Sequence, residues 1–339
     1  MKPPQQLAER GFIDALVGDG IFPLLLTGVA LAGSGGFALF LSATGHFLPH
    51  DVAYLGLDAT QLARASNPRL VNFMFHDRAA FGGSLVAVGL LYLWLAEFPL
   101  RQGESWAWWT LALSGTAGFG SFLSYLGYGY LDTWHGVATL VLLPIFLIGM
   151  VRTHQQLKGE KSWPILIQIP SWGKLGSRLK WGKGLLLVYG AGLVAAGFTI
   201  SIVGMTTVFV DTDLTYIGMT RPEICGVAAR LIPVIAHDRA GFGGGLVSIG
   251  LMVITIVLHA PITRSFRQVM LYSGGAGFLA AITVHFAIGY LDFWHLAPAF
   301  AGATIFFAGC FLVFRGPPQQ LTRETQRSDA SPSRYKNRE

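Results

Sequence analysis

Residues 76–90 read HDRAAFGGSLVAVGL, and residues 237–251 read HDRAGFGGGLVSIGL. Eleven of these fifteen positions are identical, at an offset of 161 residues. Three further pairs of segments match in the same order and at almost the same offset: GYLDTWH at 129–135 with GYLDFWH at 289–295, SGTAGF at 114–119 with SGGAGF at 273–278, and DVAYLGL at 51–57 with DLTYIGM at 213–219. Four matches in one order predict that the chain is a tandem duplication.

The duplicated segments lie in a chain with the composition of a membrane protein. Of its 339 residues, 52% are apolar and 12% are charged, whereas average soluble domains carry about 25% charged residues. Apolar runs predict eight membrane-spanning helices, at about 21–43, 79–99, 107–130, 135–151, 185–207, 240–260, 269–290 and 295–314. The sequence therefore predicts an all-α integral membrane protein built from two tandem four-helix repeats. It excludes a soluble enzyme, a disulfide scaffold and a coiled coil.

The distribution of basic residues predicts the orientation of these spans. With the N-terminus inside, 18 of the 24 Lys and Arg residues lie in inner segments, and every lysine is among them. The positive-inside rule then places both termini inside, an N-in/C-in topology, and we expect a plasma membrane of the bacterial type. The two repeats run in parallel, which excludes an inverted-repeat transporter. Because the net charge of +6 reflects topology, we expect membrane lipids as partners and no nucleic acid.

The repeats divide the chain into five segments. An inner segment, 1–20, precedes the first repeat at 21–151, and a basic inner linker at 152–184 leads to the second repeat at 185–314. The linker mixes Trp, Pro and Lys, which suits either a segment lying on an anionic inner leaflet or a solvated connector. The tail at 315–339 is rich in Gln, Arg and Ser and is predicted to be disordered.

The repeated polar residues all fall at the outer ends of predicted spans. His76-Asp77-Arg78 and His237-Asp238-Arg239 are predicted to start the second span of each repeat. Asp77 and Asp238 suit either helix N-caps or partners of arginine. These motifs predict an outer-face site lined by His, Asp and Arg that takes a small-molecule ligand or a cofactor.

A second repeated motif, YLDxWH, is predicted to start the fourth span. Asp132 and His135 stand three residues apart, as do Asp292 and His295. On a helix this spacing puts a carboxylate and an imidazole on one face, where they could bind a metal or where the carboxylate could orient the histidine. The alternative is that each Asp caps its helix and that Trp134 and Trp294 belong to an interfacial aromatic belt.

A stripe of small residues follows each HDR motif. Ala79, Gly83 and Ala87 share a helix face, and the second repeat has Ala240, Gly244 and Ser248 at the corresponding positions. Such stripes allow close approach. The approaching group is either a neighbouring helix, with the histidine hydrogen-bonded between helices, or a flat cofactor that the histidine contacts.

The four repeated histidines are expected to pair within repeats, His76 with His135 and His237 with His295, as a bis-His haem in each bundle would require. This plan resembles haem A synthase, which also has eight spans, two parallel four-helix halves, and histidines on the second and fourth helix of each half. HDR resembles the His-Arg that opens the second helix in that family. The family's upstream Glu and its outer-loop cysteine pair have no counterpart here, so its chemistry does not carry over. Arg78, Arg239, Arg69 and Arg230 could bind haem propionates or another anion.

One histidine departs from the repeat. His285 occupies the position that Tyr125 holds in the first half, so the second half is where we expect specialisation. The two cysteines, Cys225 and Cys310, have no metal-binding or haem-attachment spacing.

The motifs leave three functions open. The most concrete is a redox protein or enzyme that binds haem or a metal through His76, His135, His237 and His295. A second is a transporter or lipid-binding protein that uses the same outer vestibule for its substrate. The third is a structural membrane subunit, in which the repeated motifs fasten loops to helix ends.

The topology can be tested with a cysteine placed at Ser162 in the predicted inner linker. A membrane-impermeant thiol reagent should modify Ser162→Cys only after the inner face has been opened, because 18 of the 24 basic residues share that side. Labelling of this position in intact cells from the outside would reverse the assignment.

Overall fold

The protein is all-α, and most of its long helices are apolar. The computed structural model describes residues 18–130, 136–168 and 175–315, and this part of the chain contains no strand. Six of its helices are long and apolar enough to cross a membrane: α3 (Ile21–Ala43), α6 (Pro68–Glu97), α10 (Ser177–Met205), α13 (Leu231–His259), α14 (Arg264–Ile288) and α15 (Phe293–Phe314). These lengths and compositions fit an integral membrane protein.

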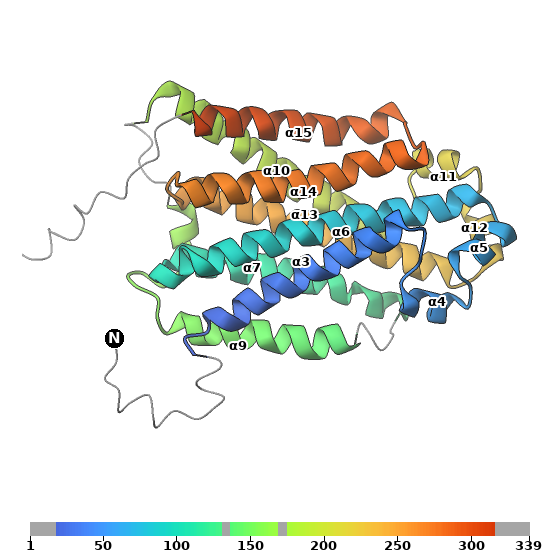
Figure 1. Ribbon diagram of the computed structural model, residues 1–339, viewed down its shortest axis with the longest axis horizontal. Helices are drawn as coiled ribbons and strands as arrows, with labels where there is room; N and C mark the ends of the chain where they lie inside the picture. The colour runs from blue at the N-terminus through green and yellow to red at the C-terminus, as the bar shows by residue number, and fades with distance from the viewer. Residues whose placement is uncertain (1–17, 131–135, 169–174, 316–339) are drawn as a thin grey trace, which may run out of the picture.

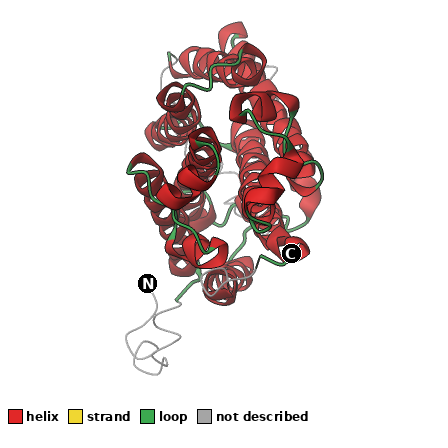
Figure 2. Ribbon diagram, turned by 90° about the vertical axis from the view of Figure 1, so that its right-hand side faces the viewer, coloured by secondary structure: helices red, strands yellow, loops and turns green. Residues whose placement is uncertain are grey.

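Two shorter helical segments take the places of the third and fourth predicted spans. Helix α7 covers Ser105–Phe122 and continues into the 3-10 helix η2 at Leu123–Tyr128. The described part of the fourth includes a π-helical segment, η3 (Ala138–Leu142), and continues as α9 (Leu143–His154). Figure 1 shows the long helices lying side by side along the longest axis, and Figure 2 looks along them.

The prediction that the HDR motifs start their helices is wrong. Helix α6 begins at Pro68, where the Asn67 side chain accepts a hydrogen bond from the Arg69 N–H, and α13 begins at Leu231. Proline at the first helical position and Asn at the N-cap are ordinary start signals. Both HDR motifs therefore lie inside a helix, which excludes a capping role for Asp77 and Asp238.

Paired glycines bring the first two long helices of each half into backbone contact. On α3 and α6, Gly35 faces Gly82 so closely that an added Cβ would lie 2.4 Å from the Gly82 carbonyl oxygen. On α10 and α13, a Cβ at Gly197 would lie 2.5 Å from the Gly243 carbonyl oxygen. Such close approach is how helices pack well in a lipid environment.

The second helix of each half packs against the third helix of the other half. Helix α6 packs along α14 of the second half, α13 packs along α7 of the first half, and α6 also touches α13. Gly83 of the small-residue stripe meets Ala280 of α14, and Gly244 meets Ser121 of α7. The stripes are thus covered by neighbouring helices, and the expectation that each half forms its own bundle is wrong.

Short helices cover one end of the bundle. They include α4 (Pro49–Leu55) and α5 (Ala59–Ala65) from the first half, and α11 (Asp211–Ile217) and α12 (Arg221–Val227) from the second. Buried side chains from both halves, among them Leu62, Phe73, Phe209 and Ile224, form a hydrophobic core at this end. The Asn67 side chain donates a hydrogen bond across the halves to the Ile217 carbonyl, at 2.8 Å.

The exchanged helix contacts predict a position-specific cost for replacing glycine. Gly83→Val should lower the free energy of unfolding by about 1–3 kcal/mol, because a Cβ at Gly83 would lie 2.4 Å from the Ala280 Cβ. Gly36→Val on α3 is the matched control, since an added Cβ there meets no atom within 4 Å. Thermal unfolding in detergent measures both variants, and equal midpoints would contradict the α6–α14 packing.

Candidate functional site

Buried ion pairs join the two HDR motifs across α6 and α13. The Arg78 guanidinium lies 2.8 Å from Asp238 Oδ2, and the Arg239 guanidinium lies 2.9 Å from Asp77 Oδ2. Each motif therefore supplies the arginine that neutralises the aspartate of the other. These four side chains are at most 11% exposed, and charges buried to this degree depend on having a partner. The sequence-based alternative of an Asp–Arg pair is thus confirmed.

Each of these arginines also binds a carboxylate on a short helix of its own half. Arg78 Nη1 lies 2.6 Å from Asp51 Oδ2 on α4, and Arg239 Nη1 lies 2.7 Å from Asp213 Oδ2 on α11. Arg78 and Arg239 are therefore each held between two carboxylates, which fixes the covering helices to the long ones.

Two tyrosines complete this arrangement. Tyr130 donates its hydroxyl hydrogen to Asp51, and Tyr290 donates to Asp213 Oδ1 at 2.9 Å. Burial opposes ionisation of Asp51, but the charges of Arg78 and His50 outweigh it, so the pKa of this carboxyl lies below its usual value. Burial and the adjacent carboxylate raise the pKa values of both tyrosines far above the usual range, so both remain hydrogen-bond donors.

The remaining repeated arginines bind backbone of the opposite half. Arg230 Nη1 donates to the Tyr54 carbonyl at 2.7 Å, and Arg69 Nη1 donates to the Tyr216 carbonyl at 3.4 Å. All four arginines, which lie in α6 or α13 or at the start of α13, therefore bind the covering helices α4 and α11.

Three histidines converge beside the Asp77–Arg239 ion pair. His76 comes from α6, His285 from α14 and His295 from the first turn of α15. One ring nitrogen from each lies within 4.8 Å of one from each of the others, and His76 Nε2 lies 2.9 Å from His285 Nε2. His76 and His285 are 5% exposed, and the His295 side chain is 20% exposed. The group thus joins both halves, and His295 is its most accessible member.

The Nδ1 atoms of the three histidines all have neighbours outside the group. His76 Nδ1 lies 3.0 Å from Asp77 Oδ1, and His285 Nδ1 lies 2.5 Å from the Ala281 carbonyl oxygen. His295 Nδ1 lies 3.1 Å from the Tyr290 hydroxyl. Hydrogen bonds of this kind orient metal-binding histidines in proteins, because they fix the tautomer and the direction of the ring.

These contacts assign the protons on His76 and His285. A carboxylate and a carbonyl oxygen only accept hydrogen bonds, so both Nδ1 atoms are donors. If both imidazoles were neutral, two unprotonated Nε2 atoms would face each other at 2.9 Å. Their lone pairs repel unless a positive charge lies between them, and that charge is either a proton on one ring or a metal ion.

The structure rearranges the predicted histidine pairs. The expected pairing of His295 with His237 is wrong, because the His295 ring centroid lies 5.6 Å from that of His76. His237 lies 3.3 Å from Asp238 and packs against the rings of Phe81, Phe122 and Tyr130. His135 and its neighbour Asp132 lie outside the described residues.

Asp292 and Trp294 follow the structural alternatives drawn from the sequence. The Asp292 side chain accepts a hydrogen bond from the His295 N–H at 2.8 Å and so caps α15. Trp294 is 77% exposed, as a residue of an interfacial belt would be. The sequence singles out His285 only because the first half has Tyr125 at the matching position. Tyr290 lies in a repeated motif, and nothing else in the sequence indicates its place in the site.

Comparisons with known proteins add no assignment: no family model, curated protein or solved structure matches the chain. The function must therefore be inferred from the geometry described above.

The crossed ion pairs predict a large effect for a single substitution. Arg239→Gln should lower the free energy of unfolding by about 3–5 kcal/mol, because it leaves the carboxylates of Asp77 and Asp213 buried without their cation. Arg101→Gln is the matched control, since Arg101 pairs with Glu97 at an exposed site and its loss should cost at most about 1 kcal/mol. Chemical or thermal unfolding in detergent measures both, and similar losses would argue against the structural role of Arg239.

Proposed function

We propose that the protein binds one transition-metal ion through His76, His285 and His295, at the outer side of a plasma membrane of the bacterial type. The remaining features of this proposal come from the sequence: eight spans in two parallel four-helix repeats, with both termini inside. The two HDR motifs and the short helices then lie at the outer end. The site belongs to both repeats, because His76 comes from the first and the other two histidines from the second.

The observation that carries the proposal is the contact between the Nε2 atoms of His76 and His285. In a square-planar or octahedral site, metal–nitrogen bonds of about 2.0–2.1 Å lie about 90° apart and separate two ligand nitrogens by about 2.9 Å. The separation here is 2.9 Å. A metal ion also supplies the positive charge that these two nitrogens need, while Asp77 and the Ala281 carbonyl hold the rings in the required tautomer.

The ligand set indicates the kind of ion. Imidazole suits zinc, copper, iron and nickel, whereas magnesium and calcium prefer oxygen ligands. Three histidines are also the donor set of catalytic zinc sites, whose tetrahedral angles would place the two nitrogens slightly farther apart, at about 3.3 Å. A haem held between His76 and His285 is disfavoured, because nitrogens 2.9 Å apart leave no room for a macrocycle between them.

Two other functions use the same residues. In a transporter or lipid-binding protein, the outer end would hold a substrate and the histidines would contact it. In a structural subunit, a proton would replace the metal, and His76 and His285 would simply hydrogen-bond α6 to α14. Metal analysis separates these from the metal-binding function.

The metal site predicts a stoichiometry that depends on specific histidines. Protein loaded with Zn²⁺ or Cu²⁺ and then gel-filtered should retain about one ion per chain, measured by elemental analysis. His285→Gln and His76→Gln should each lose most of the bound ion, because each removes one of three ligands. Addition of a chelator should lower the thermal unfolding midpoint of the wild type, since an ion that binds only the folded state stabilises it.

A matched control is His46→Gln, because His46 lies in an exposed turn near Thr44 and away from the three ligands. It should retain the ion and respond to chelator as the wild type does. A wild-type protein that retains neither ion, or a His285→Gln variant that retains as much as the wild type, would contradict the proposal and favour a proton at this site.

A further inference from the structure

A cavity of about 180 Å³ lies beside His237 of α13 and shares no residue with the three-histidine group. Helices α3, α6, α7 and α13 and the π-helical segment η3 enclose it. For comparison, an apolar cavity of about 150 Å³ in a protein core can hold benzene. This cavity can therefore accept a ring-sized group.

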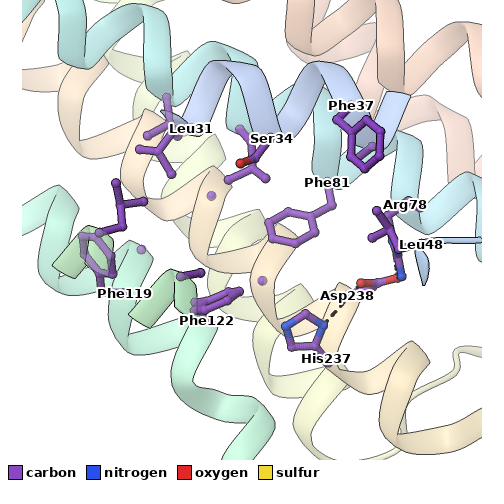
Figure 3. A pocket seen from close by; sticks show the side chains of 18 of the residues that line it. Leu31, Ser34, Phe37, Leu48, Arg78, Phe81, Phe119, Phe122, His237 and Asp238 are labelled. Atoms are coloured by element: carbon purple, nitrogen blue, oxygen red, sulfur yellow. Dashed lines mark hydrogen bonds and ion pairs between the residues drawn. The ribbon is translucent and has the colours of Figure 1, made fainter. Parts of the chain in front are cut away.

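Most of the wall is apolar and much of it is aromatic. Phe37, Phe81, Phe119, Phe122 and Leu142 line it, and Figure 3 shows the aromatic rings around the space between the helices. Phe37 is also 49% exposed on the outer surface of α3, so one edge of the cavity reaches the apolar face that a bilayer would cover. A long apolar chain can pass from the cavity into lipid at this edge.

Polar groups gather at one end of the cavity. Arg78, Asp238 and His237 lie there, and Asp51 adjoins them. The Arg78 guanidinium already binds the carboxylates of both Asp51 and Asp238, at 2.6 and 2.8 Å. Because Arg78 already binds two carboxylates, a phosphate or carboxylate head group would have to compete with them for the same guanidinium. The polar end therefore favours a ligand whose head forms hydrogen bonds and carries no charge.

We propose that this cavity binds an isoprenoid quinone, with the quinone ring among the phenylalanines and its polar edge toward His237 and Arg78. The ring matches the size and the aromatic lining of the cavity, the carbonyl or hydroxyl groups match the uncharged polar end, and the isoprenoid chain leaves past Phe37. This site is separate from the proposed metal site and does not depend on metal binding.

The test is a calorimetric titration of the full-length protein in detergent with decylubiquinone. The wild type should bind it saturably at about one per chain. Leu142→Trp places an indole in the cavity and should weaken binding by about tenfold or more, the change expected if the ring must displace a side chain. The matched control is Val141→Trp on the same segment, because Val141 is 52% exposed and does not line the cavity.

A second pair protects the test against misfolding of one variant. Leu31→Trp on α3 also fills the cavity, and Val29→Trp, at a position 56% exposed, is its control. Weakened binding in the cavity variants with unchanged binding in the controls supports the proposal. Three results would overturn it: no saturable binding by the wild type, binding by Leu142→Trp and Leu31→Trp that is as tight as that of the wild type, or displacement of decylubiquinone by phosphatidylglycerol. Because none of these variants touches a proposed metal ligand, metal content reports independently on the other site.

Discussion

The reciprocal ion pairs between Arg78 and Asp238 and between Arg239 and Asp77 are the constraint on which the rest of this structure depends. A guanidinium or a carboxylate buried among apolar helices is costly unless it is paired. Here the aspartate of each HDR motif is neutralised by the arginine of the other motif, so α6 and α13 must lie together. Asp51 and Asp213 then bind the same two arginines and hold the covering helices in place.

The ion pairs of the two halves match, but the two histidines of the HDR motifs have different surroundings. On one side of the α6–α13 pair, His76 meets His285 and His295. On the other side, His237 lies among Phe81, Phe122 and Tyr130 at the end of an apolar cavity. In the sequence match between the two halves, Tyr125 stands at the position of His285, so one difference between the halves accompanies the difference in chemistry.

Hydropathy predicted the positions of the long helices well, because runs of about 20 apolar residues have few other uses. It placed the start of α6 near 79 rather than at Pro68, since buried polar residues such as His76 and Asp77 interrupt the apolar pattern. Pairing of the histidines was beyond the reach of the sequence. A duplication indicates which residues correspond, but whether corresponding helices pack within or between halves depends on contacts such as that of Gly83 with Ala280. The sequence allows Asp–Arg pairs as one alternative, but only the structure shows that each arginine pairs with the aspartate of the other HDR motif.

The exchange of helices between the halves has a consequence for biogenesis. His76 is more than 200 positions away from the other two histidines of the group, so the group can form only after synthesis has passed His295. Until α13 is inserted, Asp77 lacks the Arg239 that neutralises it, whereas Arg78 can already bind Asp51 of its own half. In the half-made protein the short helix α4 would therefore supply a partner for Arg78, whereas Asp77 would have no arginine partner until α13 is in place. Assembly in this order makes completion of the second half the step that commits the first half to its final packing.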